Sequence, residues 1–198
     1  MKRWMILLLA CASAMAQTNE PQGGMRLLAR RFSDYTILLA AAPGEPWNAN
    51  WNDEGQMAVF NNPTNNSVIT SQYIKYPADM ALAEAAGDRD RYLDVALRKY
   101  CAVQLARSGD LMVRTQEIKI EGRLFGNNYY RYCSILGHDR RGPRRGYFYI
   151  TLRGVTSKPR YEGELLIFSV GYPESLPAQD EESVLRTVAV VLQNVSFP

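Results

Sequence analysis

The chain contains a single histidine, His138, and it is the only imidazole that could take part in catalysis. Cys133, Ser134 and Asp139 are close to it in the sequence, and hydrolases use these residue types as nucleophile and orienting acid. The Gly-x-Ser-x-Gly motif that presents a serine nucleophile is absent, however, and a catalytic triad is defined by geometry rather than by sequence neighbours. We therefore interpret His138 as a histidine in a polar hairpin loop, and a small hydrolase that uses it is the alternative.

Other signals of catalysis or cofactor binding are weak in this sequence. The acidic pairs lack the spacing of a calcium loop, and no phosphate-binding loop or dinucleotide fingerprint occurs. One histidine and three cysteines without a Cys-x-x-Cys motif give no zinc or redox signature. We expect no metal, no cofactor and no enzymatic activity.

The least ordinary segment surrounds a Gly-Pro turn and carries four arginines, followed by a tyrosine. Arginine and tyrosine together are typical of protein interfaces and of sites for anionic ligands. The predicted binding residues here are Arg140, Arg141, Arg144, Arg145 and Tyr147. The alternatives are a solvated, mobile hairpin tip that aids solubility, and a binding site for an anionic lipid or polyanion.

Two tryptophans form a second candidate surface. Trp47 and Trp51 lie in an Asn-rich stretch, where indole rings could stack on a partner. The competing interpretation is that one or both rings cover a sheet edge, because tryptophan usually buries most of its area.

Residues 1–16 have the features of a secretory signal peptide. Lys2 and Arg3 form a basic start, an apolar stretch follows, and Ala14-Met15-Ala16 is a small-x-small cleavage site. We predict export to the periplasm, a flexible leader over residues 17–31, and a single domain over residues 32–198. A lipoprotein acylated at Cys11 is the less favoured alternative, because its leader would be very short.

After cleavage, Cys101 and Cys133 would be the two remaining cysteines. An oxidising compartment favours a disulfide between them, and two buried free thiols are the alternative.

Length and composition fit one ordinary globular domain: 198 residues, 46% hydrophobic and 22% charged. The 23 basic and 20 acidic side chains give a formal charge of +3, too balanced for a protein built mainly to bind nucleic acid. We therefore expect no nucleic-acid partner and, after cleavage, no integral membrane segment.

Hydrophobic periodicity predicts strands first, then helix, then strands, then a closing helix. The strands are expected over residues 35–42, 57–60, 67–76, 111–121, 128–136, 147–153 and 162–170. Helices are expected over residues 79–86, 88–107 and 184–194, the last on a stripe of valines and leucines. Apolar residues on both pleat faces of the later strands predict an α+β fold whose mainly antiparallel sheet is covered by helices on both faces, an α/β/α sandwich.

This pattern resembles the PsbP/Mog1/DcrB-like superfamily. The resemblance lies in the early strand stopped at Pro43–Trp47, the helix ending at Ser108-Gly109, the strand meander, and the closing helix that runs into Val195–Phe197. It implies a scaffold found in exported binding and assembly factors, without a shared site that could be transferred to residues here.

The sequence thus favours an exported, non-enzymatic protein-binding factor, such as an adaptor, an assembly factor or an immunity-type inhibitor. A carrier of lipid or another small ligand is a further alternative, and it would need an apolar cavity between helix and sheet.

Overall fold

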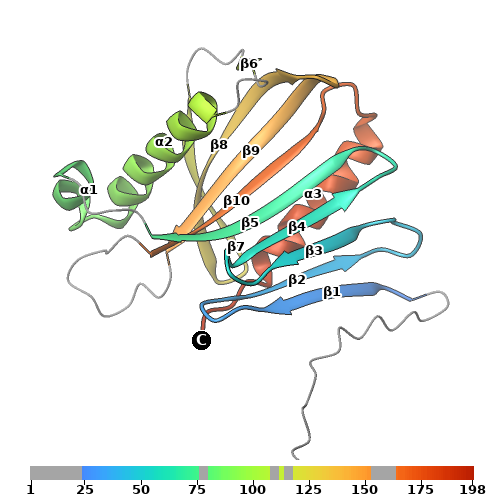
Figure 1. Cartoon of the computed structure of the whole chain (residues 1–198), viewed down its shortest axis with the longest axis horizontal. Helices are drawn as coiled ribbons and strands as arrows, with labels where there is room; N and C mark the ends of the chain where they lie inside the picture. The colour runs from blue at the N-terminus through green and yellow to red at the C-terminus, as the bar shows by residue number, and fades with distance from the viewer. Residues whose placement is uncertain (1–23, 76–79, 108–111, 114–117, 153–163) are drawn as a thin grey trace, which may run out of the picture.

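The computed structural model describes residues 24–75, 80–107, 112–113, 118–152 and 164–198 (Figure 1). The predicted signal peptide, the alternative acylation site Cys11 and most of the predicted leader lie outside these residues. Within the described segments, no helix has both the length and the apolar character needed to cross a membrane.

The described strands form one large and one small sheet, and every pairing is antiparallel. The large sheet has eight strands in the order β3-β4-β5-β10-β9-β8-β6, with β7 also paired to β8. Its strands are β3 (Asn48–Asn52), β4 (Met57–Asn62), β5 (Ser67–Lys75), β6 (Met112–Val113), β7 (Ile120–Phe125), β8 (Asn128–Asp139), β9 (Gly142–Leu152) and β10 (Glu164–Pro173). The predicted mainly antiparallel sheet with helices is confirmed.

Successive residues of β9 and β10 belong to two different hydrophobic clusters, because side chains alternate between the faces of a strand. One cluster joins Tyr149 and Phe168 to helix α3 (Ala178–Gln193). The other joins Phe148 and Ile167 to helices α1 (Met80–Ala85) and α2 (Arg89–Arg107). We call the corresponding faces of these strands the α3 side and the α2 side; α3 passes behind β4 and β5 in Figure 1.

Helix α3 forms despite its β-branched valines, because its apolar residues repeat every three or four positions. Val184, Val188 and Val191 are all buried against the sheet. Asp180 and Glu181 lie in the first turn, where the helix dipole favours negative charge. The predicted closing helix is confirmed.

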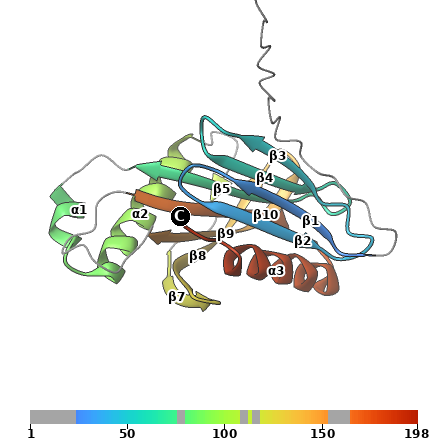
Figure 2. The ribbon, with the colours of Figure 1, turned by 90° about the horizontal axis from the view of Figure 1, so that it is seen from below.

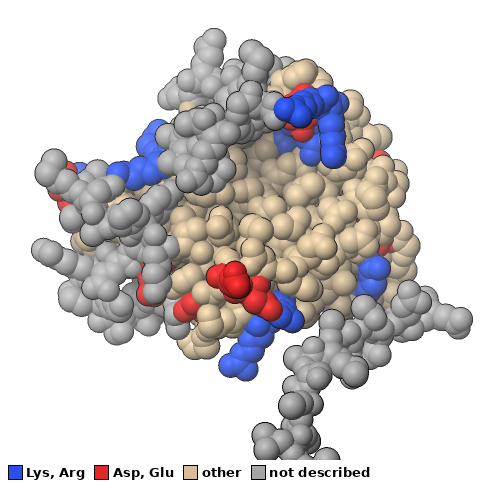
Figure 3. Space-filling model, in the orientation of Figure 1, with Lys and Arg blue, Asp and Glu red and all other residues tan. Residues whose placement is uncertain are grey.

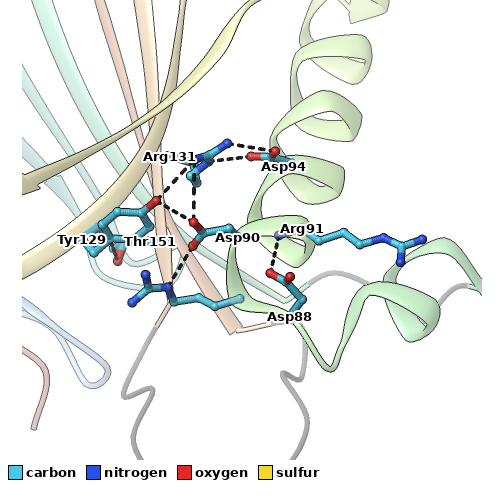
Figure 4. A network of polar contacts seen from close by, with 8 residues as sticks. Asp88, Asp90, Arg91, Asp94, Tyr129, Arg131 and Thr151 are labelled. Atoms are coloured by element: carbon cyan, nitrogen blue, oxygen red, sulfur yellow. Dashed lines mark hydrogen bonds and ion pairs between the residues drawn. The ribbon is translucent and has the colours of Figure 1, made fainter.

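Helix α2 is fixed to β8 by a polar network (Figure 4). Arg131 of β8 donates two hydrogen bonds to the Asp94 carboxylate, of 2.7 and 3.0 Å. Tyr129 donates to Asp90 at 3.0 Å, and the Arg89 guanidinium lies 4.0 Å from the centre of the Tyr129 ring. Although burial opposes ionisation, the hydrogen bonds from Arg89 and Tyr129 lower the pKa of Asp90. These contacts set the position of α2 along the sheet.

The expected leader over residues 17–31 requires a correction. Residues 26–31 form strand β1 (Arg26–Arg31), which pairs along its whole length with β2 (Thr36–Ala41) in a separate two-stranded sheet. Strand β2 lies beside α3 (Figure 2). It buries Ile37, Leu39 and Ala41 in the hydrophobic cluster that contains α3. The segment is therefore ordered by backbone pairing with a buried strand, and its many arginines concealed this from sequence reasoning.

Candidate functional site

The four predicted arginines lie at and beside the turn between β8 and β9. Arg140 and Arg141 are the two central residues of this turn and are exposed. Asp139 accepts a hydrogen bond from the backbone N–H of Arg141 at 2.8 Å, and Gly142 closes the turn with φ +118°, a backbone conformation that favours glycine. Both arginines are thus presented at the tip of a tight hairpin.

Arg144 lies on the α2 side of β9. Its Nη2 donates to the carbonyl of Asn66 at 2.9 Å, and its Nε lies 3.6 Å from the Asp139 carboxylate. The side chain is only 13% exposed, and burial lowers the pKa of Arg144 although Asp139 opposes the shift.

Arg145 lies on the α3 side. It donates to Glu181 of α3 at 2.7 Å, and the same carboxylate oxygen accepts a hydrogen bond from Tyr172 at 2.8 Å. Burial opposes its charge, but the Glu181 carboxylate raises the pKa of Arg145. The four arginines therefore do not form one basic patch: two occupy the tip, and the other two are divided between the faces of the sheet.

A hollow of about 240 Å³ opens on the α2 side beside Arg144. It is lined mainly by apolar residues and glycines of β5, β8, β9 and β10, including Val68, Ile135, Gly146, Phe148 and Gly171. The Phe148 ring is also in edge contact with Tyr100 of α2, at 5.6 Å between ring centres. Figure 3, in the orientation of Figure 1, shows a wide area of uncharged residues with Lys and Arg atoms gathered near the end of β8 and β9.

Four tyrosines form a stack on the α3 side. Tyr132 and Tyr149 are 5.3 Å apart between ring centres, Tyr147 and Tyr149 6.2 Å, and Tyr147 and Tyr172 6.3 Å, with nearly parallel planes. Tyr149 and Tyr172 are buried, whereas Tyr132 and Tyr147 are half-buried. Tyr132 donates to Glu121 at 2.6 Å, and this hydrogen bond raises the pKa of Tyr132.

Exposed residues of β8 continue this surface toward the hairpin tip. Ser134 pairs with Tyr147 across the strands and is exposed, and Leu136 pairs with Arg145 and is 36% exposed. We call this surface the tyrosine face, defined by Tyr132, Ser134, Leu136, Arg145 and Tyr147. Sequence reasoning identified Arg145 and Tyr147 but missed the other three, whose membership depends on strand register.

His138 is on strand β8 rather than in a loop, which corrects the sequence interpretation. Its side chain is exposed, and Ser134 is four strand residues away, a separation of about 13 Å. Cys133 is an odd number of residues from His138 and therefore points to the opposite face, where it is buried. Neither a Ser134–His138 pair nor a Cys133–His138 pair can form in this geometry.

The two tryptophans do not form an exposed binding surface. Trp47 is 1% exposed and belongs to the cluster that contains α3. Trp51 packs edge-on against Phe60, at 5.4 Å between ring centres, and against Phe32 at 6.4 Å. The expectation that Trp47 binds a partner is wrong, because its ring is part of the core.

Cys101 of α2 and Cys133 of β8 are in direct contact. Both are buried, their Sγ atoms are 3.5 Å apart, and no disulfide joins them in this structure. The hydrogen bond between them lowers the pKa of Cys101 and raises that of Cys133. The predicted disulfide stays a prediction, and the pair lies where it would join helix to sheet.

Several solved structures resemble this chain, although no protein-family model and no curated protein matches it. The solution structure of cyanobacterial PsbP (CyanoP) from Synechocystis is 16% identical, has a TM-score of 0.52, and covers 93% of this chain and 99% of its own. LpqN of Mycobacterium tuberculosis, involved in cell envelope biogenesis, is 9% identical with a TM-score of 0.47, covering 87% of this chain and 91% of its own. A crystal structure from Bacteroides thetaiotaomicron is 12% identical with a TM-score of 0.46, and covers 83% of this chain.

This chain spans only 45% of the length of the Bacteroides protein. At such identities the likeness concerns the fold and not the activity. The expected resemblance to the PsbP/Mog1/DcrB-like superfamily is confirmed at that level, and the chain has a PsbP-like fold.

Proposed function

We propose that the protein is an exported, non-enzymatic factor that binds another protein through the tyrosine face. The PsbP-like fold supplies the scaffold, with the sheet as a central layer between α2 and α3, and the function comes from the side chains that this scaffold presents. The observation that carries the proposal is the stack of tyrosines whose two half-buried members, Tyr132 and Tyr147, lie beside Arg145 and the exposed Leu136.

The composition of this face matches the residues that dominate binding energy in protein interfaces. Tyrosine and arginine are enriched there, because each combines a large contact area with directional hydrogen bonding. Two glutamates, Glu121 and Glu181, border this face, and their carboxylates are already hydrogen-bonded to Tyr132 and Arg145.

The face is also preorganised. The Tyr147 ring is stacked between Tyr149 and Tyr172, and the Arg145 guanidinium is held by Glu181. Side chains fixed before binding lose less conformational entropy when a partner arrives. A rigid aromatic surface of this kind is better suited to binding a protein than to catalysing a reaction.

The periplasm is the proposed compartment, on the evidence of the signal-like residues 1–16. An adaptor, an assembly factor and an immunity-type inhibitor differ in the identity of the partner, which capture from a periplasmic extract would reveal.

The capture experiment compares Leu136→Glu with Leu27→Glu. Both changes place a carboxylate on an exposed leucine, at 36% and 56% exposure, but Leu27 is on β1, far from the tyrosine face. We expect the wild type and Leu27→Glu to retain one partner and Leu136→Glu to lose it. Retention of that partner by Leu136→Glu, with the same yield as wild type, would contradict the proposal.

A further inference from the structure

We propose that the hollow on the α2 side binds a small monocarboxylate, with the apolar body of the ligand against the sheet and its carboxylate at Arg144. The hollow lies on the other side of the sheet from the tyrosine face, and Arg145 is the one residue of that face that also lines it. It is the kind of apolar cavity that a small-ligand carrier would need.

The hollow exists because glycines meet across three strands. Gly146 of β9 pairs with Gly171 of β10, and Gly137 of β8 lies two residue pairs closer to the hairpin tip, opposite Arg144. A Cβ atom at Gly171 would have Arg144 Nη2, 3.8 Å away, as its only neighbour within 4 Å among the described residues. Over Gly171 the floor of the hollow is therefore open backbone that a ligand can approach closely, whereas at Gly146 the Ile135 side chain lies 3.2 Å from where a Cβ atom would be.

The walls are mostly apolar, and the charge is at one end. Val68, Ile135 and Phe148 line the body of the hollow, and Ser169 and Thr70 supply hydroxyl groups along it. This arrangement suits a molecule that is apolar over most of its length.

Arg144 supplies the cationic end. Among the described residues, its guanidinium makes one hydrogen bond, to the Asn66 carbonyl, and one ion pair at 3.6 Å with Asp139. A guanidinium has five N–H donors in a planar fork, so it can still donate hydrogen bonds to the two oxygens of a carboxylate. Asp139 also lines the hollow, and its carboxylate accepts a hydrogen bond from the backbone N–H of Arg141. It lies 3.6 Å from Arg144 Nε, so a ligand carboxylate would compete with it for Arg144 and must gain by hydrogen-bonding the guanidinium directly. The Arg144 guanidinium is partly removed from water, and this burial lowers the pKa of Arg144. A carboxylate that pairs with the guanidinium would compensate for the lost hydration.

The volume limits the ligand to a small molecule. At about 240 Å³ the hollow is larger than the roughly 150 Å³ that holds benzene, and smaller than the roughly 300–1,000 Å³ of sites for drug-sized ligands. We therefore expect a free short-chain or aromatic monocarboxylate rather than a complete membrane lipid.

The test is an NMR titration of the purified protein with octanoate, octylammonium and octanol, followed through backbone amide shifts of β9 and β10. We expect octanoate to bind in the low millimolar range or tighter, octanol more weakly, and octylammonium least. Arg144→Gln should weaken octanoate binding by about tenfold, because a charged hydrogen-bonded contact is lost. Arg186→Gln is the matched control: it removes an exposed arginine of α3 that does not line the hollow, and it should bind octanoate like the wild type.

Gly171→Val is a second variant that does not rely on the charge. The position is in a strand, valine is favoured there, and its side chain would fill the hollow. We expect it to fold and to lose octanoate binding. The proposal would be overturned if the wild type did not bind octanoate, or if it bound octylammonium equally well. It would also be overturned if Arg144→Gln or Gly171→Val bound octanoate like the wild type. Binding to anionic phosphatidylglycerol vesicles without binding of octanoate would also overturn it, since the occupant would then be a membrane surface. If Leu136→Glu lost partner capture but still bound octanoate, the two sites would be functionally independent.

Discussion

Arg144 and Arg145 are consecutive residues of β9, and their guanidinium groups lie on opposite faces of the sheet. Arg144 contacts the carbonyl of Asn66, and Arg145 contacts the carboxylate of Glu181. A run of arginines that looks like one basic patch in the sequence thus contributes to two different surfaces.

The Arg145–Glu181 ion pair should contribute modestly to stability. It joins β9 to the first turn of α3, with side chains 37% and 26% exposed, so solvent screens it. We expect Arg145→Gln to lower the free energy of unfolding by about 0.5–1 kcal/mol in urea titrations. A double-mutant cycle with Glu181→Gln should give a coupling of the same size, and a coupling of zero would show that the contact is not stabilising.

Trp47 should behave as a core residue. Its ring is 1% exposed, so Trp47→Ala leaves a large cavity and should lower the free energy of unfolding by about 3–5 kcal/mol. Trp47→Phe, which keeps an aromatic ring, should cost clearly less. Urea or thermal unfolding followed by circular dichroism measures both, and a loss below about 1 kcal/mol for Trp47→Ala would place the ring outside the core.

The closing helix could be predicted from the sequence because its signal is local. Val184, Val188 and Val191 repeat at helical spacing, and this periodicity outweighs the preference of valine for strands. The burial of Trp47 was harder to predict, because Asn48, Asn50 and Asn52 beside it are typical of a loop. In the structure these asparagines are the exposed positions of strand β3.

The candidate sites depend on strand register, which local patterns do not give. The hollow needs Gly146 opposite Gly171, and these residues are far apart in the sequence. The tyrosine face likewise needs Leu136 opposite Arg145. Sequence analysis found the arginines and Tyr147 by composition but could not assign a face to any of them.

The two cysteines should form a disulfide when the protein is exported. Cys101 and Cys133 are already in contact, and the bond would close a loop between residues 32 positions apart. In the chain-entropy model it stabilises the fold by about 3–4 kcal/mol. Alkylation under denaturing conditions, followed by mass spectrometry of protein purified from the periplasm, should find both thiols blocked. Two alkylated cysteines in that sample would contradict the prediction, and reduction should lower the unfolding midpoint of the wild type but not of Cys101→Ala/Cys133→Ala.

Tyr35 should make stability decrease at alkaline pH. It is fully buried, donates to the carbonyl of Gln56 at 2.9 Å, and burial raises its pKa to about 12, although the hydrogen bond with Ser71 opposes this. Above pH 10 the unfolded chain ionises this phenol while the folded chain does not, so the contribution is complete below pH 10 and is lost between pH 10 and about 12. In this pH window, Tyr35→Phe should reduce the number of protons released on unfolding by about one. Equal slopes for the two proteins in urea titrations from pH 9 to 11.5 would contradict this assignment.

Site-specific crosslinking can show whether the tyrosine face contacts a protein partner in the cell. A photo-crosslinking amino acid in place of Ser134, which is exposed in the middle of the face, is compared with one in place of Leu27 on β1. After irradiation in intact cells, we predict a covalent adduct with one defined protein from position 134 and none with that protein from position 27. The same adduct from both positions, or from position 27 alone, would contradict the proposed contact.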